Sequence, residues 1–137
     1  MINRVLVIAF SLFSIPFFSF GQKNKFDLKA SMARGQEVYI AQCMSCHMEQ
    51  GEGIPEVYPP LAKSDYLMAD RKRSIDNILH GLSGEIFVNG KTYNMEMTPF
   101  PHLSDEEVSD VLNYIRNSWD NKDKNPVTPE EVKALRK

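Results

Sequence analysis

The clearest pattern of apolar and polar positions lies in LSDEEVSDVLNYIRNSW, residues 103–119. Ser104 stands before the pattern and Glu107 follows three residues later, a capping box that predicts the start of a helix. The apolar side chains that follow recur at helical spacing and would share one face, namely Val108, Val111, Leu112 and Ile115. The segment therefore predicts an amphipathic helix with one buried stripe.

Weaker helical patterns occur in four other segments. Apolar and small residues recur at helical spacing in residues 31–43 and again in residues 70–82, where Gly81 is expected to end the helix. A shorter helix is expected within residues 61–70. Residues 128–137 repeat the signals of a helix start but contain few apolar side chains, so this last helix is expected to dock weakly or to fray.

Long loops separate these helices. Residues 49–61 are dense in glycine and proline and cannot form regular structure. Within residues 83–103, Asn89 and Gly90 predict a tight turn between two short strands, a small hairpin. These short helices, one hairpin and loops of this length do not enclose an ordinary apolar core, so we expect a bound group to occupy the space between them.

The N-terminal residues have a different composition. An apolar run at residues 5–20 is followed by a small-x-small sequence, which predicts a signal peptide over residues 1–21 and a mature chain that begins at Gln22. The alternative is an uncleaved anchor, which would associate the protein with a membrane. We expect a flexible leader over residues 22–30, and location in the periplasm or outside the cell.

The charge of the chain argues against nucleic acid as a partner. The formal net charge is −2, and the chain shows no basic stripe of the kind that nucleic-acid binding requires.

The two cysteines of the chain stand close together, as Cys43 and Cys46 in CMSCH, with His47 directly after them. C-x-x-C-H is the attachment signature of c-type haem, because two thiols one helical turn apart can reach two vinyl groups on one edge of the macrocycle. The histidine then faces the iron. Three alternatives fit less well: a zinc site needs a fourth ligand, a thiol-redox pair needs a βαβ setting, and a disulfide leaves His47 unexplained.

The second axial ligand of the iron is not settled by spacing. Met95 and Met97 both lie in the loop after the hairpin, where alternate residues share one face. His80 and His102 are further candidates.

These motifs resemble the class I c-type cytochromes, a family of monohaem electron carriers. The likeness covers residues 31–119 and is carried by GQEVYIAQCMSCH, YPPLAKSDYL, ILHGLSGEIFVNGKTYNMEMTPF and LSDEEVSDVLNYIRNSW. It implies the all-α cytochrome c fold, in which three to five short helices, a small hairpin and long loops surround one covalently bound haem c with its iron. Residues 120–137 would be a charged tail with a short terminal helix.

The resemblance also implies roles for single residues. Met97 is the counterpart of the family's methionine ligand, although Thr98 stands where the family commonly has proline, and Met95 is the backup. A proline carbonyl from YPPL, that of Pro59 or Pro60, would accept a hydrogen bond from the proximal histidine; we assign this role to Pro60. Gly35 and Tyr114 are the counterparts of the positions at which the first and last helices of the family cross.

The sequence thus predicts a monomeric single-electron carrier rather than an enzyme, with redox proteins as partners. The basic side chains that could rim an exposed haem edge are Lys63, Arg71, Lys72, Arg73 and Lys91, although a solvated surface explains each of them. Two alternatives keep the haem: a subunit of a larger oxidoreductase, held by residues 120–137, or a sensor of small ligands with a labile sixth ligand.

Overall fold

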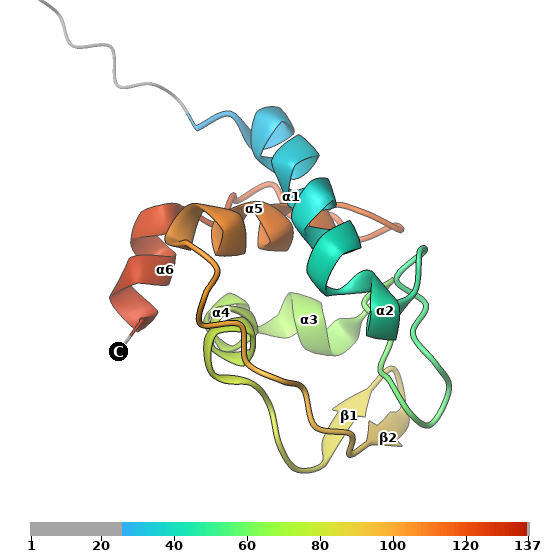
Figure 1. The fold of residues 1–137 in the computed structure, drawn as a ribbon. Coiled ribbons are helices and arrows are strands. Elements are labelled where there is room, and N and C mark those ends of the chain that lie inside the picture. The colour runs from blue at the N-terminus through green and yellow to red at the C-terminus, as the bar shows by residue number, and fades with distance from the viewer. Residues whose placement is uncertain (1–25, 137) are drawn as a thin grey trace, which may run out of the picture.

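A computed structural model describes residues 26–136. The predicted signal peptide lies outside the described residues. Within these residues, six helices and two strands follow one another (Figure 1): α1 (Leu28–Gln42), α2 (Met44–His47), α3 (Asp65–Ala69), α4 (Arg71–His80), β1 (Ile86–Val88), β2 (Lys91–Tyr93), α5 (Asp105–Ile115) and α6 (Pro129–Leu135). The mainly helical fold with a small hairpin confirms the predicted fold class. Among the described residues, no helix has the length and apolar character needed to cross a membrane.

Helix α1 begins earlier than the sequence pattern suggested. Asp27 caps it, because Oδ1 accepts a hydrogen bond from the backbone N–H of Ala30 at 3.0 Å. The helix therefore starts at Leu28, inside the segment predicted to be a flexible leader, and that prediction is wrong for residues 28–30.

Helices α1 and α5 cross at Gly35. A Cβ atom there would lie 1.9 Å from the backbone oxygen of Asp110, so the close approach depends on the absence of a side chain. Tyr114, which the resemblance also placed at the crossing, packs farther along α1: its ring centroid lies 5.5 Å from that of Tyr39 and 5.5 Å from that of Trp119. Glycine thus sets the separation of the helices, and the aromatic cluster fills the space beyond it.

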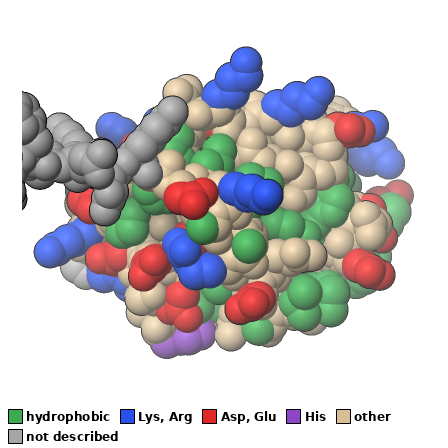
Figure 2. Space-filling view, turned by 90° about the horizontal axis from the view of Figure 1, so that it is seen from above, with side chains coloured by type: hydrophobic (Ala, Val, Ile, Leu, Met, Phe, Trp, Pro, Cys, Tyr) green, Lys and Arg blue, Asp and Glu red, His purple; other side chains and the backbone are tan. Residues whose placement is uncertain are grey.

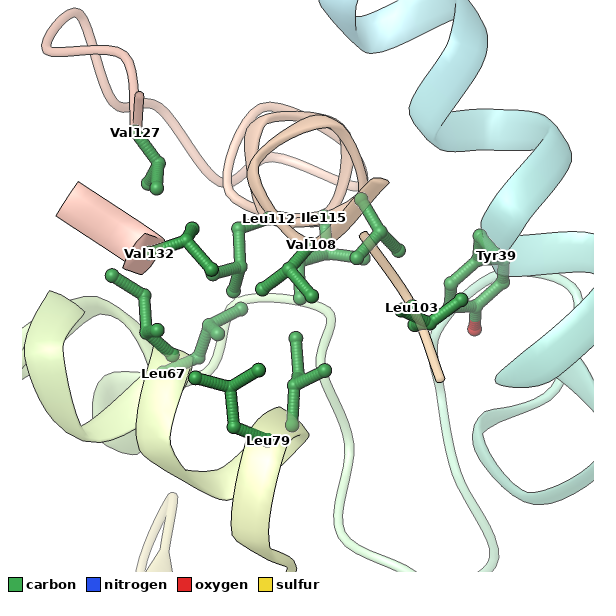
Figure 3. Packing of buried hydrophobic residues seen from close by; sticks show 12 residues of the cluster. Tyr39, Leu67, Leu79, Leu103, Val108, Leu112, Ile115, Val127 and Val132 are labelled. Atoms are coloured by element: carbon green, nitrogen blue, oxygen red, sulfur yellow. The ribbon is translucent and has the colours of Figure 1, made fainter. Parts of the chain in front are cut away.

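The stripe predicted on α5 is the centre of the core. Val108, Val111, Leu112 and Ile115 are all at most 5% exposed. Figure 3 shows Leu112 and Val108 facing Leu79 of α4 and Val132 of α6. Helices α1, α3, α4, α5 and α6 therefore share one apolar cluster.

The tail after residue 119 belongs to the same packed unit. Val127 and Val132 have no solvent exposure. Arg136 donates to the carboxylate of Asp105 at 2.7 Å and to the backbone oxygen of Leu103 at 2.7 Å. The expectation that the terminal helix docks weakly is therefore wrong, because Val132 is completely buried in the core and Arg136 adds polar contacts at the end of the helix.

The predicted hairpin is confirmed. Strands β1 and β2 are antiparallel, with Ile86 opposite Tyr93, and Asn89 and Gly90 form the turn with positive φ angles of 50° and 79°. Two hydrogen bonds of 3.0 and 2.8 Å between Asp65 and Asn89 fasten this turn to the start of α3.

Candidate functional site

The cysteine–histidine motif occupies a short helical turn directly after α1. The backbone N–H of Cys43 donates to Tyr39 at 2.9 Å and closes α1, while that of His47 donates to Cys43 at 3.0 Å and closes α2. The thiols of Cys43 and Cys46 are both free and partly buried. One turn of helix therefore presents two thiols and an imidazole together, as the spacing predicted.

His47 is oriented by a proline carbonyl. Its Nδ1 lies 3.0 Å from the backbone oxygen of Pro59, an acceptor, so Nδ1 carries the proton and Nε2 keeps its lone pair. Burial lowers the pKa of His47, and the hydrogen bond to Pro59 opposes this shift. Burial thus favours the neutral imidazole, and Nε2 is the nitrogen left free of the Pro59 hydrogen bond.

The assignment of this hydrogen bond to Pro60 is corrected by the structure. Two adjacent prolines cannot be told apart by spacing, and only the fold of the loop decides which carbonyl faces the histidine. Pro60 instead lines the apolar cavity beside His47.

That loop is fixed by its own backbone. The N–H groups of Leu61 and Ala62 both donate to the oxygen of Gly51, at 2.7 and 2.8 Å, and the N–H of Gly53 donates to the oxygen of His47 at 3.0 Å. The glycine- and proline-rich segment is irregular, as predicted, yet its hydrogen bonds hold the Pro59 carbonyl in place.

An apolar cavity opens against His47. Its walls come from α3, α4, β1, α5 and the loop after the motif. Among the residues that line it are Cys43, His47, Leu67, Ile78, Leu82, Val88, Met97, Leu112 and Ile115. A neighbouring pocket shares Cys43, His47 and Met97 and adds Cys46 and Met95.

The two candidate methionines have different surroundings. Met97 lines both pockets, and its backbone pairs with Leu82 through hydrogen bonds of 3.0 and 2.8 Å. Met95 is 50% exposed and lines the neighbouring pocket but not the cavity against His47.

The two histidines considered as alternatives lie elsewhere. His80 is exposed and its Nδ1 contacts Asp76 at 2.9 Å. His102 is exposed beside Phe100, with ring centroids 6.0 Å apart. Neither side chain lines the two pockets.

The residues present fit a covalently attached haem. Burial raises the pKa of the Cys43 thiol to about 12, and the neighbouring Cys46 adds to this effect. A thiol in such surroundings is a poor thiolate ligand but is suited to a neutral thioether, and the apolar walls suit the faces of a macrocycle. The described part of the chain contains no cluster of three or more His, Cys, Asp or Glu side chains that could hold a bare metal ion.

Three of the five basic side chains that could have formed a rim are engaged within the chain. Lys63 pairs with Asp120 at 3.0 Å, Arg71 pairs with Glu131 at 3.6 Å, and Arg73 lies 3.7 Å above the ring of Tyr66. On the face shown in Figure 2, acidic and basic side chains are interspersed.

Sequence reasoning missed several residues around the cavity. Tyr66 and Asn77 bring polar groups to its wall. Arg116 is 5% exposed; its Nε donates to Asp123 at 2.8 Å, and its guanidinium also reaches the backbone oxygen of Leu67, which lines the cavity. Asn77 is adjacent to Ile78 and therefore points to a different side of α4, and no local signal marks a buried arginine.

Comparisons with known proteins support the fit of this site to covalently attached haem. Residues 32–119 match the sequence family described as cytochrome c. Cytochrome c-552 of Thermus thermophilus is 42% identical over 117 residues, which cover 80% of this chain and 78% of that protein. The cytochrome c subunit of a quinone-dependent alcohol dehydrogenase from Gluconobacter oxydans is 34% identical over 105 residues, 74% of this chain but 22% of that subunit. The cytochrome c subunit of gluconate 2-dehydrogenase from Pantoea cypripedii is 34% identical over 108 residues, 75% of this chain and 24% of that subunit. With a family match over most of its length and an attachment motif that opens into an apolar cavity, the chain belongs to the cytochrome c family, whose members bind haem c and its iron covalently and use them for electron transfer.

Proposed function

We propose that this protein is a single-electron carrier of the cell envelope, with haem attached to Cys43 and Cys46 and with His47 and Met97 as the two axial ligands of the iron. The observation that carries the proposal is that His47 and Met97 line one apolar cavity, and each is held by hydrogen bonding to the backbone of a neighbour, Pro59 for His47 and Leu82 for Met97. When bound, the haem supplies an iron that alternates between the ferric and ferrous states.

The residues around the iron would influence how readily it changes between the ferric and ferrous states. A thioether sulfur is a soft donor that favours ferrous iron, so Met97 would raise the reduction potential. Pro59 would make the imidazole of His47 a stronger donor. With both axial positions filled and water excluded by the cavity walls, little would rearrange on electron transfer, and no position would be left for substrate.

Met97 is proposed over Met95 because of burial and backbone support. The segment around Met97 is paired with Leu82, whereas Met95 is half exposed. A sulfur atom that must stay bound to iron in both oxidation states needs an anchored backbone, which Met97 has.

Optical spectra of the purified holoprotein test the ligand set. Wild type and Met95→Ala are expected to show low-spin bands when reduced, a weak far-red sulfur-to-iron band when oxidised, and no binding of carbon monoxide. Met97→Ala is expected to lose the far-red band and bind carbon monoxide. Binding of carbon monoxide by wild type would instead support a sensor with a labile sixth ligand, and a far-red band lost only in Met95→Ala would move the ligand to Met95.

Export is proposed from the sequence of residues 1–21, with cleavage after Gly21. Intact mass of the protein purified from the envelope fraction is expected to correspond to a chain that begins at Gln22. A mass that includes residues 1–21 would support the uncleaved membrane anchor.

A second candidate function is that of a haem module in a larger dehydrogenase. Its support is the likeness to cytochrome c subunits of alcohol and gluconate dehydrogenases, of which this chain spans about a quarter or less. Gel filtration of the native protein from its own cells separates the two. A free monomer fits the carrier, and stable co-elution with a dehydrogenase fits the module.

A further inference from the structure

Gly81 ends α4 in a conformation that few other residues adopt. Its φ and ψ angles are 80° and −178°, and its N–H donates to the oxygen of Asn77 at 3.0 Å, the last hydrogen bond of the helix. This backbone turn sends the chain into Leu82, which pairs with the segment that carries Met97.

A side chain at Gly81 would collide with that segment. A Cβ atom built there would lie 2.6 Å from the backbone oxygen of Met97, 3.1 Å from Cδ of Pro99 and 3.2 Å from the backbone nitrogen of Pro99. The closest neighbour is backbone rather than the tip of a flexible side chain, so only a shift of the methionine segment can relieve the contact.

The methionine segment is held on both sides of this contact. Leu82 exchanges two hydrogen bonds with Met97, and the N–H of Phe100 donates to the oxygen of Ile78 at 2.8 Å. These bonds draw residues 97–100 onto the end of α4, and Gly81 lies between the two attachment points. The size of the side chain at residue 81 therefore limits how closely residues 97–100 can pack against the end of α4.

We propose that Gly81 is a positioning residue for Met97. The missing Cβ lets the backbone of Met97 lie against the end of α4, at the depth from which its sulfur binds the iron. The inference rests on the proposed function, because it takes Met97 as the axial ligand.

A quantitative consequence follows from competition at the iron. Met97 and carbon monoxide compete for one coordination position, so carbon monoxide affinity rises by the factor by which the methionine–iron binding constant falls. Residues in direct contact typically couple strongly enough to change a binding constant by about tenfold.

The test compares Gly81→Ala with Gly90→Ala in the holoprotein. Gly90 has a φ angle of 79°, nearly that of Gly81, but a Cβ atom there would meet nothing within 4 Å. Both variants therefore place a Cβ atom on a backbone with positive φ, and only Gly81→Ala brings that atom against the segment that carries Met97. Carbon monoxide affinity of the ferrous form and the far-red band of the ferric form are measured for both, with far-ultraviolet circular dichroism as a check of folding.

We expect Gly81→Ala to lose or shift the far-red band and to bind carbon monoxide about tenfold more tightly than Gly90→Ala. In a Met97→Ala background, Gly81→Ala should change carbon monoxide affinity little, because no methionine is left to displace. An equal spectrum and affinity in the two glycine variants overturns the proposal. So does a Gly81→Ala protein that does not fold while Gly90→Ala does, because Gly81 would then serve the stability of the whole domain.

Failure of the proposed function has a different signature. If Met97→Ala leaves the far-red band and carbon monoxide affinity of the wild type unchanged, the ligand assignment is wrong whatever the glycine variants do. If Met97→Ala changes both and Gly81→Ala changes neither, only the role of Gly81 is wrong.

Discussion

Asn113 is a single buried side chain that joins three parts of the molecule. Its Nδ2 donates to Oγ of Ser31 and to the backbone oxygen of Val127, both at 2.9 Å. Its Oδ1 accepts the backbone N–H of Val127 at 2.7 Å. One amide thus links α1, α5 and the tail, and it satisfies both backbone polar groups of a completely buried residue.

We predict that Asn113→Ala lowers the free energy of unfolding by about 2–4 kcal/mol, because both buried backbone groups of Val127 lose their partner. Asn125→Ala is the control: Asn125 lies in the same tail but is exposed, and a change within about 0.5 kcal/mol is expected. Urea unfolding of the holoproteins measures both. Equal values for the two variants would show that water satisfies Val127 as well as Asn113 does.

Single residues show most clearly which parts of the candidate site could be predicted from sequence and which depend on the fold. Cys43, Cys46 and His47 could be predicted because their chemistry depends on adjacent positions in the sequence. The choice between Pro59 and Pro60 depends on how a loop turns, and the different burial of Met95 and Met97 depends on contacts with the distant end of α4. Neither is encoded in local spacing.

At the scale of elements, local signals predicted helix starts well and docking poorly. Ser104 with Glu107 and Thr128 with Glu131 form complete capping boxes in the structure. Asp27 was overlooked as a cap, although an aspartate before a helical segment is a recognised start signal. Docking of α6 depends on its packing against α4 and α5. The number of apolar residues within α6 does not reveal this contact.

Docking of α6 gives a prediction for Val132, which has no exposed surface. Val132→Ala is expected to lower the free energy of unfolding by about 2 kcal/mol, through lost apolar burial and a small cavity. Lys133→Ala, next to it on the exposed side, should change stability by about 0.5 kcal/mol or less. Thermal unfolding of the two variants decides between a docked helix and a frayed one. If the helix were frayed, both substitutions would leave the free energy of unfolding nearly unchanged.

The capping box of α5 gives a pH dependence. The pKa of Glu107 lies below its ordinary value of 4.5 because the backbone N–H and then the hydroxyl of Ser104 donate to its carboxylate. A folded-state pKa below the unfolded one gives stability that is present above pH 4.5 and lost as the pH falls through the folded value.

We therefore expect Glu107→Gln to be less stable than wild type at pH 7 by roughly 0.5 kcal/mol, the usual size for a charge at a helix start. The difference should shrink as the pH falls below 4.5 and the wild-type carboxylate is protonated. Unfolding curves over a pH series measure it. In a Ser104→Ala background the same substitution should have less effect, and an unchanged effect there would assign it to the backbone N–H of residue 104 and the helix dipole rather than to the hydroxyl.

At the scale of the whole molecule, the apolar core and the cofactor cavity are two parts of one interior. Leu67, Ile78, Val111, Leu112 and Ile115 belong to the buried cluster and also line the cavity. Without haem, these side chains would border an apolar cavity beside His47. The crossing of α1 and α5 relies instead on Gly35 and on the hydrogen bonds of Asp110, which do not depend on the cofactor.

This division predicts what happens when haem cannot be attached. The double variant Cys43→Ala/Cys46→Ala should keep much of its helical circular dichroism, because the α1–α5 contact persists, but lose its cooperative thermal transition and bind a hydrophobic dye. Ser45→Ala, an exposed residue between the two cysteines, is the control and should attach haem and unfold like wild type. A haem-free variant that unfolds cooperatively without dye binding would mean that the cavity closes on its own, and that the long loops need no cofactor to organise them. The opposite result would make haem a structural component of the core, so that the group that carries the electron also determines the fold around it.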